Sequence, residues 1–183
     1  MKKNFLNNEI WLLTFGASFQ RANAYLPNAS ETDKRHFKSM ISGHIENLLS
    51  QYKNSNISDD VHIENIKSVS DYSKYFSSIF VNGKINFGIA QKMLNLYLKY
   101  QWCLGNIAEP PHFPVDRIIQ QKLNESARQC KQNQLNLEPW TRFKDEMHYL
   151  KVVNHARDLA KIDNSFKGLS PANIELTLFE RRL

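Results

Sequence analysis

The stretch FGIAQKMLNLYLKYQWCLG at residues 87–105, followed by PPHFPVDRII at 110–119, decides the fold of this chain. On a helix of about 100° per residue, the apolar side chains of the first part cover well over half of the circumference. We expect such a helix inside the fold, with neighbours on several sides. The prolines end it, and a second helix is predicted from Val115 to Lys131, with Pro114 at or near its first turn.

Helical spacing of apolar residues also dominates the rest of the chain, which has only six Gly and six Pro in 183 residues. Further helices are predicted at 8–23, from Ser30 through Tyr52, from Ser70 through Phe80, from Pro139 through about Leu159, and from Ser170 to the region of Phe179. The segment VHIENI at 61–66 alternates weakly, which suggests a short extended piece. The prediction is an all-α fold, a compact single-domain bundle of about seven helices over residues 1–183.

Composition and charge limit the class of protein. The apolar fraction of 42 % and the charged fraction of 23 % are ordinary for a globular protein that is not membrane-embedded. The net charge is +6, and residues 81–131 carry seven basic against three acidic side chains. This local excess permits nucleic acid as a partner, but a solvated basic surface explains it equally well.

The two cysteines, Cys103 and Cys130, are too few for a disulfide framework or a cysteine-only metal site, and a cytoplasmic setting is the default expectation. The apolar run near the N-terminus is short and follows Glu9 and three asparagines, so a first helix is predicted rather than a signal peptide or membrane span. His148 and His155 lack a third ligand in helical register. No metal, no cofactor and no membrane partner are expected.

Lys92 is the first candidate for chemistry. It lies about one turn into its predicted helix, where the positive end of the helix dipole disfavours a cation. Partial burial would lower its pKa further and make a neutral amine available as a nucleophile. The alternative is that its flexible stem carries the ammonium to solvent. Gly88, Gln91, Asn95 and Lys99 share the narrow polar line of this helix, which faces either water or a groove.

Asp116 is the second candidate. It follows Pro114 and precedes two isoleucines, so its simplest role is to cap the next helix. A capping aspartate is also held rigidly, and a rigid carboxylate near an amine can accept a proton or stabilise a developing cation. His112 stands in the turn between Lys92 and Asp116, where it either faces the same pocket or is exposed.

The ordered pair of G-x-A-Q-K at Gly88–Lys92 and P-V-D-R-I at Pro114–Ile118 resembles the helix-hairpin-helix DNA glycosylase superfamily. The archaeal 8-oxoguanine glycosylase branch is the most similar, since its lysine-to-aspartate connection is long and proline-bearing. The resemblance covers about forty residues, Gly83 to Lys122. The turn VNGKINFG departs from the L-P-G-x-G signature of the family.

This resemblance implies a helix-hairpin-helix-like centre and a DNA-repair hydrolase, a base-excision glycosylase with or without lyase activity. Lys92 would be the nucleophile that attacks the sugar C1′, and Asp116 the carboxylate that assists it. The partner would be duplex DNA with an extruded base. The DNA- and substrate-binding residues would be Gly88 with its turn, Gln91, Asn95, Lys99, His112 and Arg117.

Two other interpretations stay open. The first is a non-catalytic helical module that binds nucleic acid or a protein through its basic face, with Lys92 as one phosphate contact among several. The second is a structural or assembly subunit, in which Trp11, Trp140 and Phe179 supply interface surface.

Overall fold

The computed structural model describes residues 1–53 and 57–179, and over these residues the chain forms seven α-helices, as predicted. The helices are α1 (Lys2–Phe19), α2 (Glu31–Leu48), α3 (Asp59–Tyr72), α4 (Phe87–Cys103), α5 (Arg117–Gln129), α6 (Glu146–Ile162) and α7 (Pro171–Leu178). Three short 3₁₀ helices connect them: η1 (Leu49–Tyr52), η2 (Ser73–Ile79) and η3 (Trp140–Arg142). The described part contains no strand beyond an isolated bridge between Tyr25 and Phe80. The all-α prediction is confirmed.

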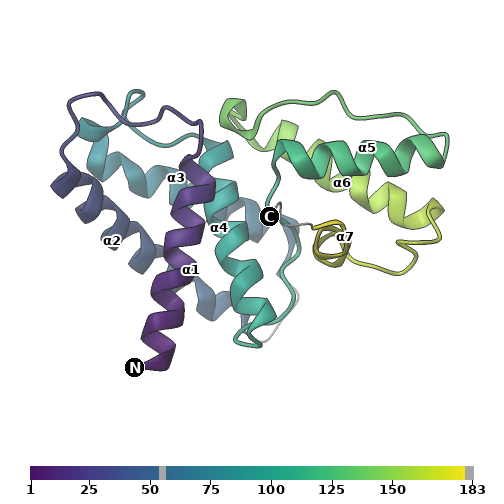
Figure 1. Ribbon diagram of the computed structural model, residues 1–183, viewed down its shortest axis with the longest axis horizontal. Helices are drawn as coiled ribbons and strands as arrows, with labels where there is room; N and C mark the ends of the chain where they lie inside the picture. The colour runs from purple at the N-terminus through teal and green to yellow at the C-terminus, as the bar shows by residue number, and fades with distance from the viewer. Residues whose placement is uncertain (54–56, 180–183) are drawn as a thin grey trace.

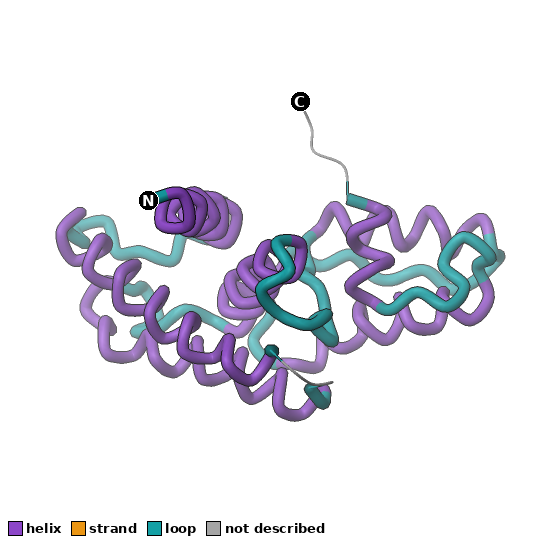
Figure 2. The backbone as a smooth tube through the Cα atoms, turned by 90° about the horizontal axis from the view of Figure 1, so that it is seen from below, coloured by secondary structure: helices purple, strands orange, loops and turns teal. Residues whose placement is uncertain are grey.

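The helices form two halves that lie side by side along the long axis of the molecule (Figure 1). The N-terminal half consists of α1 to α4, and the C-terminal half of α5 to α7. Helix α4 stands between them and packs against α1, α3 and η3. In the perpendicular view, α1 beside the N-terminus lies above the rest of its half (Figure 2). Buried apolar side chains from both halves form one contiguous cluster.

Helix α4 is the buried element that its sequence predicts. Every residue from Phe87 to Lys99 is buried, including Gln91 and Lys92. Asn86 caps its first turn by accepting a hydrogen bond from the backbone N–H of Ile89 at 2.9 Å. A helix buried on all sides must give each polar side chain a partner inside the protein, and this requirement shapes the candidate site.

Polar caps set the beginnings of most other helices. The capping side chains are Ser30, Ser58, Asp116, Asp145 and Ser170 for α2, α3, α5, α6 and α7. Each accepts a hydrogen bond from a backbone N–H that would otherwise have no partner. The prediction that Asp116 caps its helix is confirmed.

The structure corrects four local predictions. Residues 61–66 are helical in α3, because His62 is buried beside Ile63 and Ile66 and the true spacing is that of a helix. Ser70 lies inside α3, where its hydroxyl donates to the carbonyl of Ile85 instead of capping a new helix. Helix α1 begins and ends earlier than 8–23. Pro139 precedes only the short η3, and α6 begins later, at Glu146.

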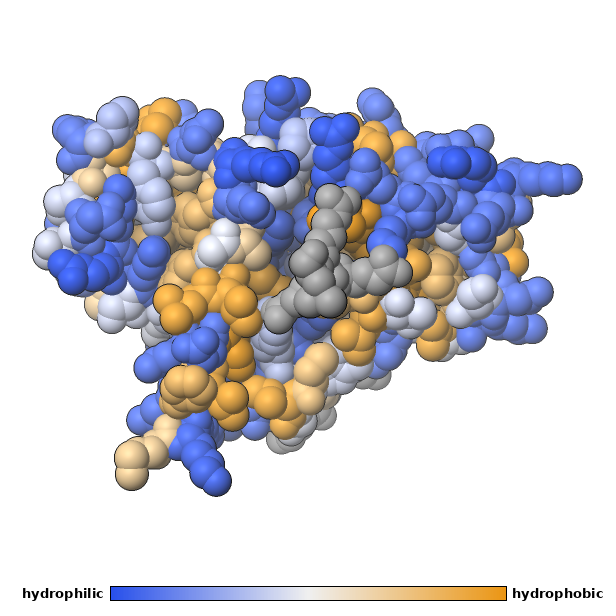
Figure 3. Space-filling model, in the orientation of Figure 1, coloured by the Kyte–Doolittle hydropathy of each residue, from blue (hydrophilic) through white to orange (hydrophobic). Residues whose placement is uncertain are grey.

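Apolar side chains gather over α1 on the face shown in Figure 3. They include Phe5, Leu12 and Leu13, which are all exposed. None of the helices in the described ranges is both long and apolar enough to span a bilayer.

Candidate active site

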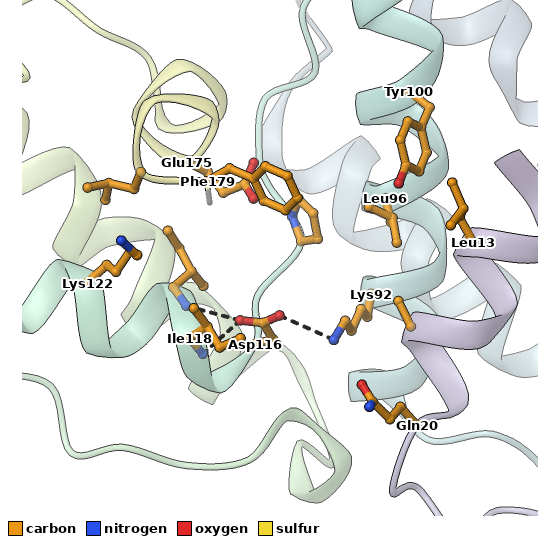
Figure 4. A pocket seen from close by; sticks show the side chains of 14 residues that line it. Leu13, Gln20, Lys92, Leu96, Tyr100, Asp116, Ile118, Lys122, Glu175 and Phe179 are labelled. Carbon is orange, nitrogen blue, oxygen red and sulfur yellow. Dashed lines mark hydrogen bonds and ion pairs between the residues drawn. The ribbon is translucent and has the colours of Figure 1, made fainter. Parts of the chain in front are cut away.

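A pocket of about 260 Å³ opens where the two halves meet (Figure 4). Helices α1 and α4 form one wall, and α5 and α7 form the other. Its polar and charged lining residues are Gln20, Lys92, Tyr100, Asp116, Lys122 and Glu175. The rest of the wall is apolar. A small concave site with a few polar groups on an apolar wall is typical of ligand-binding pockets.

Lys92 and Asp116 point toward one another across this pocket from α4 and α5 (Figure 4). The Lys92 Nζ atom lies 3.3 Å from Oδ2 of Asp116. Lys92 is only 6 % exposed, and its ammonium also lies 3.7 Å from the centre of the Trp140 ring, a cation–π contact. The two residues that the sequence singles out, twenty-four positions apart, therefore share one site.

Asp116 uses its two carboxylate oxygens differently. Oδ1 accepts hydrogen bonds from the backbone N–H groups of Ile118 at 2.9 Å and Ile119 at 3.0 Å, and so begins α5. Oδ2 is directed at Lys92. Capping and pairing are thus simultaneous, and the cap fixes the carboxylate beside the amine.

Burial lowers the pKa of Lys92, and the nearby charge of Asp116 partly opposes this shift. Desolvation disfavours the ammonium, whereas the carboxylate stabilises it. A lysine with a lowered pKa releases its proton more readily to a neighbouring base. The pair therefore combines a potential nucleophile with the group that can take its proton.

A second ion pair, between Lys99 and Glu175, lies about two turns further along α4. Lys99 Nζ donates to Oε1 of Glu175 at 2.9 Å and lies 2.7 Å from Oε2. The same ammonium lies 3.8 Å from the centre of the Phe179 ring. Burial raises the pKa of Glu175, the charge of Lys99 opposes the shift, and Asp116 adds a smaller rise. The pair attaches α7 to α4 and brings Glu175 and Phe179 to the pocket.

Three predicted binding residues lie elsewhere. Gln91 makes two hydrogen bonds with the backbone of Val115, at 2.8 and 3.1 Å. Asn95 contacts His62 Nε2 and the Tyr149 hydroxyl, each at 2.9 Å. His112 is buried and contacts the same hydroxyl at 3.0 Å. The structure does not bring Gln91, Asn95 or His112 to the pocket, because their polar atoms are bonded inside the protein.

Gly88 and Arg117 complete the predicted set. The N–H of Gly88 donates to the carbonyl of Phe143 at 3.1 Å, and a Cβ at this position would lie 1.6 Å from the carbonyl oxygen of Trp140. Gly88 is therefore packed against η3 and has no N–H left for a phosphate. Arg117, in contrast, is exposed at the start of α5, directly after Asp116.

Sequence reasoning did not place Glu175 at the site or Trp140 under the lysine. A glutamate beside the apolar Ile174 on a short helix was the available signal for Glu175. Trp140 and Trp11, named above as possible interface surface, are instead both buried in the core cluster, and the Trp140 ring also contacts Lys92. In residues 1–53 and 57–179, no three His, Cys, Asp or Glu side chains are grouped so that they could hold a metal ion.

Comparison with known protein families, with curated proteins and with solved structures finds no match to this chain. The class of the site is therefore defined by its own geometry, a lysine amine and an aspartate carboxylate paired at the edge of a small, mainly apolar pocket.

Proposed function

We propose that this protein is a DNA glycosylase that excises a modified base, with Lys92 as the nucleophile and Asp116 as its partner. The observation that carries the proposal is the 3.3 Å approach of the two side chains in a pocket that opens between the halves. The resemblance of Gly88–Lys92 and Pro114–Ile118 to glycosylase motifs supplies the reaction class. The helix-hairpin-helix-like centre belongs to the same proposal.

The chemistry follows from the pair. The Lys92 ammonium transfers a proton to Asp116, and the neutral amine attacks C1′ of the extruded nucleotide. The glycosidic bond breaks, the base leaves with the bonding electrons, and it takes the proton that Asp116 had accepted, which restores the Asp116 carboxylate. A proton then moves from Nζ to O4′ as the C1′–O4′ bond breaks, which leaves a hydroxyl at C4′ and a protonated Schiff base on Nζ. The restored Asp116 carboxylate faces this positive charge and stabilises it.

The pocket suits a single extruded base better than a larger ligand. Its volume of about 260 Å³ is close to the lower end of ligand pockets, which begin at about 300 Å³. The apolar wall offers Leu96, Pro114 and Ile119 as packing surface for a planar ring. Arg117 is exposed next to Asp116, and Lys122 lines the pocket, so positive side chains stand near the position of the flanking phosphates.

This reaction needs no cofactor, because the nucleophile and the proton acceptor are both side chains of the chain itself. The proposed setting is the cytoplasm. The cysteines of this chain, Cys103 and Cys130, are both free thiols, which agrees with a reducing compartment.

The test is covalent trapping. Labelled duplexes with an oxidised, alkylated or deaminated base, or an abasic site, are incubated with the protein and borohydride, which reduces the Schiff base to a stable amine. We expect an adduct that falls at least about 10³-fold in Lys92→Gln. The matched control, Lys74→Gln, removes an exposed lysine of η2 and should leave the adduct unchanged.

Asp116→Asn sharpens the assignment, because asparagine also caps helices and should preserve the hydrogen bonds that begin α5. We expect excision to fall about 10²- to 10⁴-fold with no loss of folding, as judged by circular dichroism. If no substrate gives an adduct while salt-sensitive DNA binding remains, the protein is a non-catalytic module. If DNA does not bind even at low salt, both nucleic-acid interpretations are wrong.

A further inference from the structure

The Lys92 amine has a second partner beside Asp116, an aromatic ring from a distant part of the chain. The centre of the Trp140 ring lies 3.7 Å from the Lys92 ammonium, and Oδ2 of Asp116 lies 3.3 Å from the same atom. Trp140 is 9 % exposed and does not line the pocket, so it contacts the amine from within the protein. A ligand in the pocket would meet the ring only through its effect on the lysine.

The segment before Trp140 is bonded to the helix that carries Asp116. The side chain of Gln120, buried on α5, accepts a hydrogen bond from the backbone N–H of Glu138 at 3.0 Å and donates one to the carbonyl of Glu138 at 2.7 Å. The same amide group donates to the backbone carbonyl of Asp116 at 3.0 Å. Gln120 therefore fixes the two partners of Lys92 relative to one another.

The segment after Trp140 is bonded to the beginning of α4, the helix that carries the lysine. The side chain of Asn86, which caps α4, donates to the backbone carbonyl of Thr141 at 2.6 Å. The N–H of Gly88 donates to the carbonyl of Phe143 at 3.1 Å. Hydrogen bonds on both sides of Trp140 thus hold its backbone, and the backbone places the ring.

The indole N–H takes no part in this arrangement. Within the described residues, Nε1 of Trp140 is buried and has no hydrogen-bond acceptor. A buried donor without a partner is costly, and a phenyl ring would fill similar space without that cost. What an indole offers beyond a phenyl ring is the most favourable face for a cation. The ammonium that it contacts therefore explains a tryptophan at this position better than packing does.

We infer that Trp140 is a positioning residue for the Lys92 amine: its ring holds the ammonium beside Asp116 and sets the pH at which the amine becomes a free nucleophile. The inference rests on the proposed function for what this nucleophile attacks. Cation–π attraction acts on the ammonium and not on the neutral amine, so it favours the protonated form. It opposes burial, which lowers the pKa of Lys92, and acts in the same direction as the Asp116 carboxylate.

The other charged groups around the amine stay in place when Trp140 is replaced. Asp116 and Lys122 line the pocket from α5, and Glu175 lines it from α7. The α1 residues in the pocket lining are uncharged. A change in the ionisation of Lys92 on replacement of Trp140 therefore reports the loss of the ring.

The test is an NMR titration of the full chain labelled with ¹³C at lysine Cε, whose chemical shift follows the charge of the amine. The Lys92 signal is the one that Lys92→Gln removes, and the exposed Lys74 is the internal reference. We expect the midpoint of the Lys92 titration to fall by about one pH unit in Trp140→Leu. Trp140→Phe keeps a ring with a weaker face for the cation, so its midpoint should fall by about half as much.

Phe143→Leu is the matched control, because it removes a buried aromatic ring from the end of η3 and leaves the indole. It should leave the Lys92 midpoint unchanged. A purely structural role predicts the same midpoint in the wild type and in both Trp140 variants, and that result would overturn the inference. An equal fall in Phe143→Leu would do so too. If Trp140→Leu does not fold, Trp140→Phe decides alone, since an unchanged midpoint there contradicts the inference.

Borohydride trapping at abasic sites separates this inference from the proposed function. Attack requires the neutral amine, so the pH profile of trapping in Trp140→Phe should move by the same amount as the Lys92 titration. A shifted titration in a protein that forms no adduct with any duplex would show that Trp140 controls the amine and that the glycosylase proposal is wrong. An adduct at Lys92 together with a titration that does not depend on the ring would show the reverse.

Discussion

Helix α4 presents polar side chains to two very different environments, although Gln91 and Lys92 are neighbours in the chain. On one side, Gln91 and Asn95 join a hydrogen-bond network that is buried as far as His112 and ends at the partly exposed Asp59–Arg157 ion pair. On the other side, Lys92 lines an open pocket and pairs with Asp116, and Lys99 pairs with Glu175, whose side chain lines the same pocket. The difference indicates that the first side specifies the fold and the second side is available for a ligand.

The network side is saturated with hydrogen bonds. Asn95 bonds to His62 and Tyr149, and Tyr149 bonds in turn to His112. His112 contacts Asp59 at 3.0 Å, and Arg157 closes the chain with two bonds to the same carboxylate at 2.7 and 2.8 Å. On the pocket side, each lysine forms an ion pair, Lys92 with Asp116 at 3.3 Å and Lys99 with Glu175 at 2.9 Å. The comparison is therefore between a buried hydrogen-bond network and two ion pairs, three members of which line the pocket.

The largest effect on stability should come from the network side. Asn95→Ala leaves Nε2 of His62 without its hydrogen-bond partner in a buried site and removes one of the two partners of the Tyr149 hydroxyl, so we expect the free energy of unfolding to fall by about 3 kcal/mol. Urea denaturation measures it. The control Asn106→Ala removes an exposed asparagine and should cost no more than about 0.5 kcal/mol. A similar loss in both variants would contradict a structural role for the network.

A smaller effect should appear in acid. Burial lowers the pKa of His112 to about 4, although Asp59 opposes the shift. Below its ordinary pKa of 6.5 the unfolded chain takes up the proton first, so stability falls as the pH drops from about 6.5 to about 4. We expect the free energy of unfolding to fall by about 1–2 kcal/mol between pH 7 and pH 5. Urea denaturation at each pH measures this change.

The comparison in acid is between His112→Gln and His36→Gln. The first variant removes one of the buried histidines and should reduce the dependence of stability on pH, while His62, whose pKa burial also lowers, keeps its own contribution. The second removes an exposed histidine and leaves the network intact. The pKa of Asp59 is lowered to about 2, chiefly by its hydrogen bond from Arg157. The stability that Asp59 contributes is therefore lost only below pH 3.8, outside the range in which His112 acts. An equal slope in wild type and His112→Gln would refute the assignment.

The smallest effect on stability should come from the pocket side. Lys92→Met removes a buried cation and keeps a side chain of similar length, while Asp116 retains its two backbone hydrogen bonds. We expect a change in the free energy of unfolding within about 1 kcal/mol of zero, in contrast to Asn95→Ala. Thermal denaturation of Lys92→Met measures this change, and the exposed-site variant Lys74→Met is the control. A loss of several kcal/mol would mean that the pair exists to hold the halves together.

Much of the fold was predictable from local patterns. The burial of α4 follows from its apolar circumference, and the capping role of Asp116 follows from its place after proline and before two isoleucines. The juxtaposition of Lys92 and Asp116 was expected through the motif resemblance. The error at 61–66 arose because the weak alternation of VHIENI suggested an extended piece, whereas His62 and Asn65 are polar residues that tertiary hydrogen bonds bury on the inner face of a helix.

The rest of the site depends on contacts between distant parts of the chain. Glu175 on α7 is held beside the pocket by its ion pair with Lys99 on α4, which lies seventy-six residues earlier in the chain. Trp140 lies under Lys92 because η3 packs on the first turn of α4. Gln91 and Asn95 are four residues apart on α4, as are Lys92 and Leu96, which do line the pocket. No periodicity distinguishes an inward polar side chain that meets a protein partner from one that meets a ligand.

The packing of Gly88 has a consequence for how the glycine–lysine spacing is understood. The carbonyl of Trp140 occupies the space that any side chain would need at position 88. The same tryptophan touches the amine four residues further on. A methyl group there would push η3 outward and carry the indole with it, and the amine would lose its aromatic support. Gly88 thus helps to fix the position of the Lys92 Nζ atom by leaving room for Trp140, although Gly88 itself does not line the pocket.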